Sequence, residues 1–144
     1  VRAAQAKKDI IVRNPFSIRP YQHVLEPLYA YLMIAARQYE DGKFAGYYNV
    51  GPDDVDCFQT GTLVNLFVQK WGDGIKWIDR YDGGPHEANF LKLDCSKLKT
   101  TFGWTPRWDL DTAIAKVVEW SKCWVNGGDV RVCMDRQISE FYNK

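Results

Sequence analysis

The 144-residue chain has a globular composition and nearly balanced charge. It is 46% hydrophobic and 26% charged, and 19 basic residues against 18 acidic ones give a net charge of +1. The composition allows a substantial core. The charge balance argues against a general nucleic-acid binder or membrane-surface protein, because both usually carry a basic excess. No apolar run approaches the ~20 residues that span a bilayer, and no signal peptide is recognisable, so we expect a soluble, cytoplasmic protein.

The four cysteines do not form a metal-binding pattern. None lies in a C-x-x-C pair or beside two histidines, the arrangements that zinc sites usually need. We expect no metal and four reduced, mostly packed thiols of a cytosolic protein, at Cys57, Cys95, Cys123 and Cys133.

Strand and helix patterns alternate at the start of the chain. The chain opens at Val1 without methionine, and residues 2–7 read as the tail of a helix, so we expect a fragment of a longer protein. Residues 9–13 are apolar and β-branched, which predicts a strand. A helix should follow, ending at Asp41-Gly42, because apolar residues recur at three and four positions. Its predicted inward face is Leu28, Tyr31, Leu32, Ala35, Ala36 and Tyr39.

The middle of the chain predicts two more strands, at 46–51 and 75–78, around a helix. Thr60 would cap that helix and Gly72 would end it. Residues 90–93 should be extended. The inward face of the helix is predicted to include Leu63, Leu66, Phe67 and Trp71.

The last third of the chain is predicted to be helical. Asp94 should cap a short helix that Gly103 ends, and Asp109 or Asp111 should begin the next one. A final helix would carry Met134, Ile138, Phe141 and Tyr142. Strands alternating with helices, followed by a helical region, favour an α/β fold with parallel strands. The six tryptophans mostly occupy core-packing positions, which we favour over a role in base stacking.

Motifs for catalysis are absent from the sequence. No Gly-rich phosphate loop follows a strand, no G-x-S-x-G occurs, and the two histidines have no ligand-like partner at i+4.

Arg19 is the first candidate binding residue. It lies in a strand-to-helix connection, where α/β proteins commonly bind ligands, and its guanidinium could hold a phosphate through two hydrogen bonds. The alternative is a surface arginine paired with Glu26 or Asp53. His23, just before the helix, is more typical of a structural imidazole than of a catalytic one.

Glu87 is the second candidate, in a loop after Gly83-Gly84. A carboxylate there could accept hydrogen bonds from the two hydroxyls of a ribose. The alternative is a solvated loop acid with no specific partner. Asn49 could reach the same cleft from the end of the strand predicted at 46–51.

Three motifs occur together in the order of a known family. They are IRPYQHVLEPLYAYL (18–32), YYNVGP (47–52) and HEANFLKLDCSKLKTTFGWTPRW (86–108). They resemble the R-x-x-x-H-V and D-x-S-K-x-x-x-x-L-G-W-x-P segments of the extended short-chain dehydrogenase/reductases that act on nucleotide sugars. Most members have aspartate after the arginine. Pro20 stands there in this chain, a form typical of the dehydratase branch that uses CDP-sugars.

This resemblance implies an α/β fold: the last strands and helices of a Rossmann-type domain plus a mainly helical substrate-binding lobe, formed by residues 1–144. The NAD-binding portion, with the catalytic Tyr-x-x-x-Lys pair of the family, would lie upstream of this chain. Arg19 matches the arginine that grips the diphosphate, and Glu87 matches the acid that contacts ribose. Gly84 stands where relatives often carry an arginine, for which Arg80 could compensate. No catalytic or cofactor-binding residue is expected here, and relatives are usually homodimers.

Two alternatives remain open from the sequence. Another member of the family, such as a nucleotide-sugar 4-epimerase or reductase, would share most of these motifs, although Pro20 argues against it. A binding module without catalysis is the other alternative.

Overall fold

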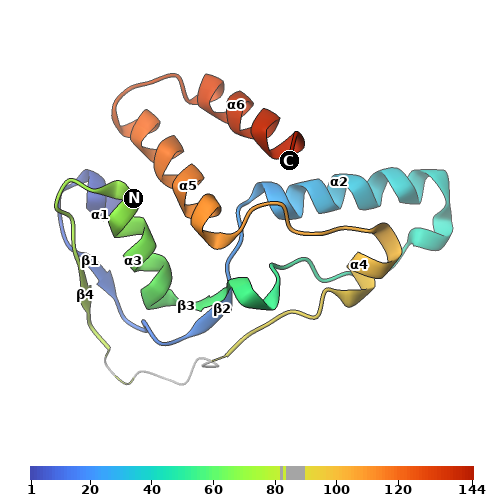
Figure 1. Ribbon diagram of the computed structural model, residues 1–144, viewed down its shortest axis with the longest axis horizontal. Coiled ribbons are helices and arrows are strands. Elements are labelled where there is room, and N and C mark those ends of the chain that lie inside the picture. The colour runs from blue at the N-terminus through green and yellow to red at the C-terminus, as the bar shows by residue number, and fades with distance from the viewer. Residues whose placement is uncertain (82, 84–89) are drawn as a thin grey trace.

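The computed structural model describes residues 1–81, 83 and 90–144. Its elements follow in chain order: α1 (Arg2–Gln5), β1 (Ile10–Val12), β2 (Ile18–Pro20), α2 (Leu25–Glu40), the 3₁₀ turns η1 (Gly42–Phe44) and η2 (Asp54–Asp56), β3 (Cys57–Gln59), α3 (Thr60–Trp71), β4 (Trp77–Asp79), α4 (Ser96–Phe102), α5 (Leu110–Val125) and α6 (Val130–Tyr142) (Figure 1). The described helices include none long and apolar enough to cross a bilayer. The alternation of short strands and helices confirms the predicted α/β class.

The strands of the described residues form two small sheets. β1 pairs with β4 in parallel, with Ile10 opposite Trp77, and β2 pairs antiparallel with β3, with Arg19 opposite Phe58. The predicted strand at 9–13 is therefore confirmed. The strand predicted at 75–78 begins later, because Ile75 turns into the core instead of joining the ladder.

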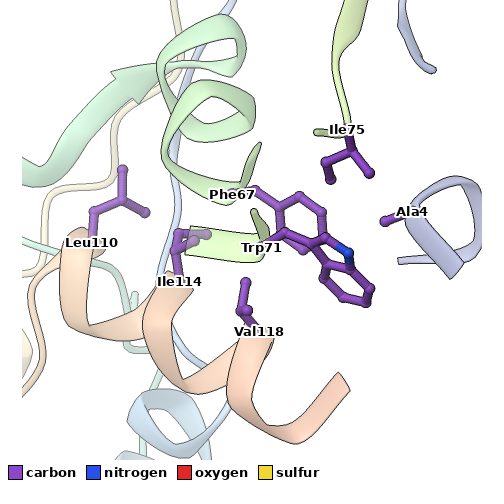
Figure 2. Close-up of a cluster of buried hydrophobic side chains, with 7 residues drawn as sticks. All are labelled: Ala4, Phe67, Trp71, Ile75, Leu110, Ile114 and Val118. Carbon is purple, nitrogen blue, oxygen red and sulfur yellow. The ribbon is translucent and has the colours of Figure 1, made fainter. Parts of the chain in front are cut away.

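A core between α3 and α5 supports the parallel strands. Figure 2 shows the side chains of α5 pointing toward Phe67 and Trp71 of α3, with Ala4 of α1 and Ile75 beyond Trp71. The rings of Phe67 and Trp71 stack at 5.4 Å. Burying such large apolar side chains is the main favourable term in folding. The full cluster is Ala4, Phe67, Trp71, Ile75, Leu110, Ile114 and Val118.

A second core joins α2 to α4. Ala30, Leu98 and Trp104 are almost completely buried, with Phe102 packed against them. α4 ends at Gly103, whose left-handed φ of 67° suits a residue without Cβ. The predicted burial of Leu98 and the predicted stop at Gly103 are both confirmed.

The sequence analysis assigned the wrong inward face to α2. Its buried residues are Glu26 and Ala30, whereas Leu32 is 71% exposed and Tyr39 is 95% exposed. The helix carries apolar residues on two sides, and periodicity cannot say which side the chain covers. α6 behaves similarly: Phe141 is buried, but Met134 and Ile138 are about half exposed.

The segment 46–51 is not a strand, which corrects a second prediction. Its side chains nevertheless alternate, with Tyr47 and Asn49 exposed and Tyr48 and Val50 partly buried. No neighbouring strand among the described residues pairs with it. A strand needs a hydrogen-bonded neighbour as well as an alternating pattern, so the sequence pattern alone was insufficient.

Candidate functional site

Arg19 lies in the middle of β2, which has neighbours on both sides. β3 pairs along one edge. On the other side, Ile18 bridges Phe90 in parallel, and the Leu91 N–H donates to the Ile18 carbonyl at 3.1 Å. The Arg19 guanidinium donates to the same carbonyl at 2.9 Å. Both main-chain hydrogen bonding and its own side-chain contact therefore hold the arginine in place.

The turn that precedes Arg19 is fixed by the start of α3. The N–H groups of Thr60 and Gly61 donate to the carbonyls of Ser17 and Pro15, at 2.9 and 2.8 Å. The Thr60 hydroxyl lies 2.6 Å from that of Tyr21. Because the first N–H groups of a helix lack partners inside the helix, the turn caps α3. Thr60, the predicted cap, is itself the first helical residue, and the N-cap is Gln59, one position earlier than predicted.

The two acids suggested as surface partners of Arg19 have other partners. Glu26 is fully buried, and its carboxylate accepts from the backbone N–H groups of Arg107 and Trp108, at 2.9 and 2.8 Å. Burial raises the pKa of Glu26 despite these hydrogen bonds. Asp53 pairs with Lys99.

His23 has the surroundings of a structural residue. It is buried, its Nδ1 accepts from the Leu25 N–H at 3.3 Å, and its ring meets the Trp108 ring edge-on at 4.9 Å. Burial lowers the pKa of His23, and the charge of Lys116 lowers it further. The neutral imidazole therefore anchors the turn into α2, as the structural interpretation predicts.

Asn49 also has a structural partner. Its side-chain amide donates to the Asp94 carbonyl at 3.0 Å and so joins the extended segment to the approach to α4. Glu87 and Gly84 lie outside the described residues. Arg80 is exposed, and its backbone N–H donates to the Val12 carbonyl at 2.8 Å. The predicted convergence of Arg19 and Glu87 on one cleft thus stays a prediction.

A polar hollow of about 660 Å³ lies beside α4. Two ion pairs compensate four of its charges, since Lys92 pairs with Asp54 at 3.2 Å and Lys99 with Asp53. Asp94 also lines the hollow, and its carboxylate accepts from the Ser96 N–H at 2.9 Å. Burial raises the pKa of Cys95, so its thiol is not an activated nucleophile. The described residues contain no group of three or more side chains placed to hold a metal ion.

The sequence analysis missed one feature of this region, an exposed aromatic pair. The rings of Phe16 and Tyr81 meet edge-on, with centroids 5.7 Å apart, and the two residues are 55% and 58% exposed. Phe16 lies three residues before Arg19. Phe16 follows a proline in a turn, and no sequence motif there predicts its contact with Tyr81.

Comparison with known proteins places this geometry in context. No protein-family model matches the chain. It is 43% identical over 142 residues to CDP-glucose 4,6-dehydratase of Salmonella typhimurium, an alignment that covers 98% of this chain and 40% of that protein. The structure is similar to that of UDP-N-acetylglucosamine 4-epimerase from Bacillus cereus, with a TM-score of 0.61 and 16% identity, over 81% of this chain and 39% of the other.

The chain therefore spans about two fifths of the length of each of these proteins. The structural likeness, at 16% identity, is a likeness of fold alone. Together the comparisons agree with what the three motifs predict: the sequence resembles part of CDP-glucose 4,6-dehydratase, and the fold is similar to part of UDP-N-acetylglucosamine 4-epimerase.

Proposed function

We propose that this chain is the C-terminal, substrate-binding portion of a CDP-glucose 4,6-dehydratase. The observation that carries the proposal is the 43% identity to that enzyme across 98% of the chain. The overall reaction would be redox-neutral: C4 of the hexose is oxidised to a ketone, water leaves across C5 and C6, and the hydride lost from C4 returns to C6 while C5 regains a proton. The product would be a 4-keto-6-deoxy sugar nucleotide. Such a product would serve deoxysugar biosynthesis, including that of the O-antigen of lipopolysaccharide.

In this proposal Arg19 binds the diphosphate of the nucleotide sugar. The strand pairing of β2 and the cap on α3 hold its backbone before any ligand arrives. Such preorganisation lowers the entropy lost on binding. Glu87 is proposed to accept from the ribose hydroxyls. Phe90, three positions after Glu87 in the sequence, is bridged to Ile18, the residue before Arg19.

The substrate-binding portion is further proposed to pack against an NAD-binding portion. Two features support this arrangement: the exposed apolar side of α2, and the alternating segment 46–51. Large exposed apolar faces and extended segments without a neighbouring strand usually mark surfaces that another part of a protein covers. Leu28, Tyr31 and Leu32 form the centre of the α2 surface.

The residues of this chain do not fit a site for NAD. The sequence has no Gly-rich phosphate loop. Its one Tyr-x-x-x-Lys spacing, Tyr39 and Lys43, does not form a catalytic pair, because Tyr39 is 95% exposed and Lys43 pairs with Asp41 at 2.7 Å. NAD is thus proposed as a cofactor of the full-length enzyme, and no step is assigned to it here. The full-length enzyme is further proposed to be a cytoplasmic homodimer. The four free thiols support a reducing compartment.

Titration of the full-length protein with CDP, UDP and dTDP tests the proposal, together with an assay for conversion of CDP-glucose. We expect CDP to bind most tightly. Arg19→Ala should weaken CDP binding by about 2–3 kcal/mol, the scale of a lost charge-assisted hydrogen bond. Arg131→Ala, at an exposed arginine of α6, is the matched control and should leave the affinity unchanged. Equal binding of CDP by wild type and Arg19→Ala would reject the role of Arg19, and failure to convert CDP-glucose would reject the activity.

A further inference from the structure

Phe16 is held outward by a rigid turn. Pro15 and Ser17, on either side, are both buried, whereas Phe16 is 55% exposed. The turn is tied down by the hydrogen bonds from Thr60 and Gly61 and by a 3.0 Å contact between the hydroxyls of Ser17 and Thr60. A mobile loop could fold an exposed phenylalanine away from water, but this turn prevents it.

The backbone of Tyr81, the second residue of the pair, is also held by a hydrogen bond. Its backbone N–H donates to the Asp79 carboxylate at 2.8 Å, in a turn directly after β4. The Arg80 N–H extends the β1–β4 pairing by donating to the Val12 carbonyl. Because β1 and β4 are parallel, their carboxyl ends meet at one edge (Figure 1). Along the chain, Phe16 follows the end of β1 by four residues and Tyr81 follows the end of β4 by two. Ligands of open α/β sheets bind at this edge.

Arg19 lies close to Phe16 along the chain. The two residues are three positions apart, so their Cα atoms are at most ~11 Å apart even when the chain is fully extended. A base and a diphosphate of one nucleotide are separated on a similar scale. Single exposed apolar residues are common on protein surfaces. Here two exposed aromatic rings contact each other, and one of them lies three positions before a candidate phosphate-binding arginine.

We propose that Phe16 and Tyr81 form an aromatic platform for the nucleobase of the substrate. Because their rings stand at 80° to each other, the base would stack on the face of one ring and meet the other at its edge. This inference rests on the proposed function, because it needs a nucleotide whose diphosphate is held by Arg19. Aromatic side chains stack with any base, so the platform supplies affinity for the base and fixes the nucleotide along one direction. It does not by itself discriminate cytosine from uracil.

Binding measurements on the full-length enzyme test the platform, with CDP and inorganic pyrophosphate as probes. Phe16→Ala and Tyr81→Ala should each weaken CDP binding about tenfold and leave pyrophosphate binding unchanged. Phe16→Trp should retain CDP affinity, since it keeps an aromatic face. Tyr142→Ala, at a 71% exposed tyrosine near the end of α6, is the matched control and should have no effect.

The outcomes separate this inference from the proposed function. If Arg19→Ala loses CDP affinity while Phe16→Ala and Tyr81→Ala do not, the nucleotide site stands and the platform is wrong. An equal loss of CDP and pyrophosphate binding would also overturn it, because the pair would then position the arginine rather than touch the base. A lowered melting temperature with normal CDP binding would make the pair an internal contact, against the inference. If the wild-type enzyme does not bind CDP, both fall.

Discussion

Glu26, fully buried in α2, accepts a hydrogen bond of 2.8 Å from the backbone N–H of Trp108, 82 residues further along the chain. The same oxygen accepts from the Arg107 N–H, so one carboxylate joins the start of α2 to the segment that leads into α5. The backbone N–H of Leu110, nearby, donates to Asp56 at 3.1 Å. Glu26 lies at the start of α2, and Asp56 lies directly before β3. The two acids therefore connect the surroundings of β2 to the segment that leads into α5.

Replacing Glu26 by alanine should lower the free energy of unfolding by about 2–4 kcal/mol, because two buried N–H groups lose their acceptor and a cavity remains. Glu26→Gln should cost less, since its amide oxygen can still accept from both. Chemical denaturation of the two variants provides the comparison. Equal stability of Glu26→Ala and wild type would show that the two N–H groups find other partners.

The stability of the protein should respond to the ionisation of His23. Burial, and secondarily the charge of Lys116, lowers the pKa of His23 below its ordinary 6.5. The unfolded chain therefore binds a proton at His23 more readily than the folded chain does. The contribution of His23 to stability is complete above pH 6.5 and declines as the pH falls below that value toward the lowered pKa.

His23→Asn isolates this effect, because an asparagine oxygen can accept from the Leu25 N–H but does not titrate. We expect the variant to be less stable at neutral pH, through loss of the ring contact with Trp108, yet to lose less stability than wild type between pH 7 and 5. Melting temperatures across that range provide the test. Parallel pH profiles for both proteins would mean that His23 is not the titrating group.

Gly103 should be sensitive to substitution for conformational reasons alone. Its φ is 67°, and an added Cβ would meet no atom within 4 Å, so no clash contributes. Gly103→Ala should cost about 1 kcal/mol, because a side chain disfavours the left-handed conformation. Gly42→Ala is the matched control: it also has open space, but its φ is outside the left-handed range. Thermal unfolding should show a loss for Gly103→Ala that exceeds the one for Gly42→Ala.

Local signals predicted the helix ends well. Asp109 accepts from the Thr112 N–H at 2.8 Å at the start of α5, and Gly103 ends α4, because caps and left-handed stops depend on residues close in sequence. The faces of α2 and α6 were less predictable. Which apolar side is buried depends on segments far along the chain, and periodicity contains no such information.

In the candidate site, too, local sequence predicts some features, whereas others depend on the tertiary fold. The motif around Arg19 was visible in the sequence, and the structure adds that β3, Phe90 and the start of α3 hold it. The contact between Phe16 and Tyr81 was not visible, because 65 residues separate the two and neither lies in a recognisable motif. The parallel pairing of β1 with β4 brings them to one edge. Such contacts follow from the tertiary fold.

The exposed side of α2 provides a test of the proposed arrangement with an NAD-binding portion. Leu32 is 71% exposed in this chain. If the full-length protein buries this side, Leu32→Lys should lower its free energy of unfolding by about 2–3 kcal/mol, because a charged amine would lose its hydration. In this chain alone the same change should be nearly neutral.

Val132→Lys serves as the control for this comparison, since Val132 is 62% exposed on α6, outside the proposed surface. It should have little effect in either protein. Denaturant titration of the three proteins, with and without the NAD-binding portion, separates the possibilities. A cost for Leu32→Lys that is the same in both contexts would show that the α2 surface stays in water. The NAD-binding portion would then have to lie against another part of the molecule.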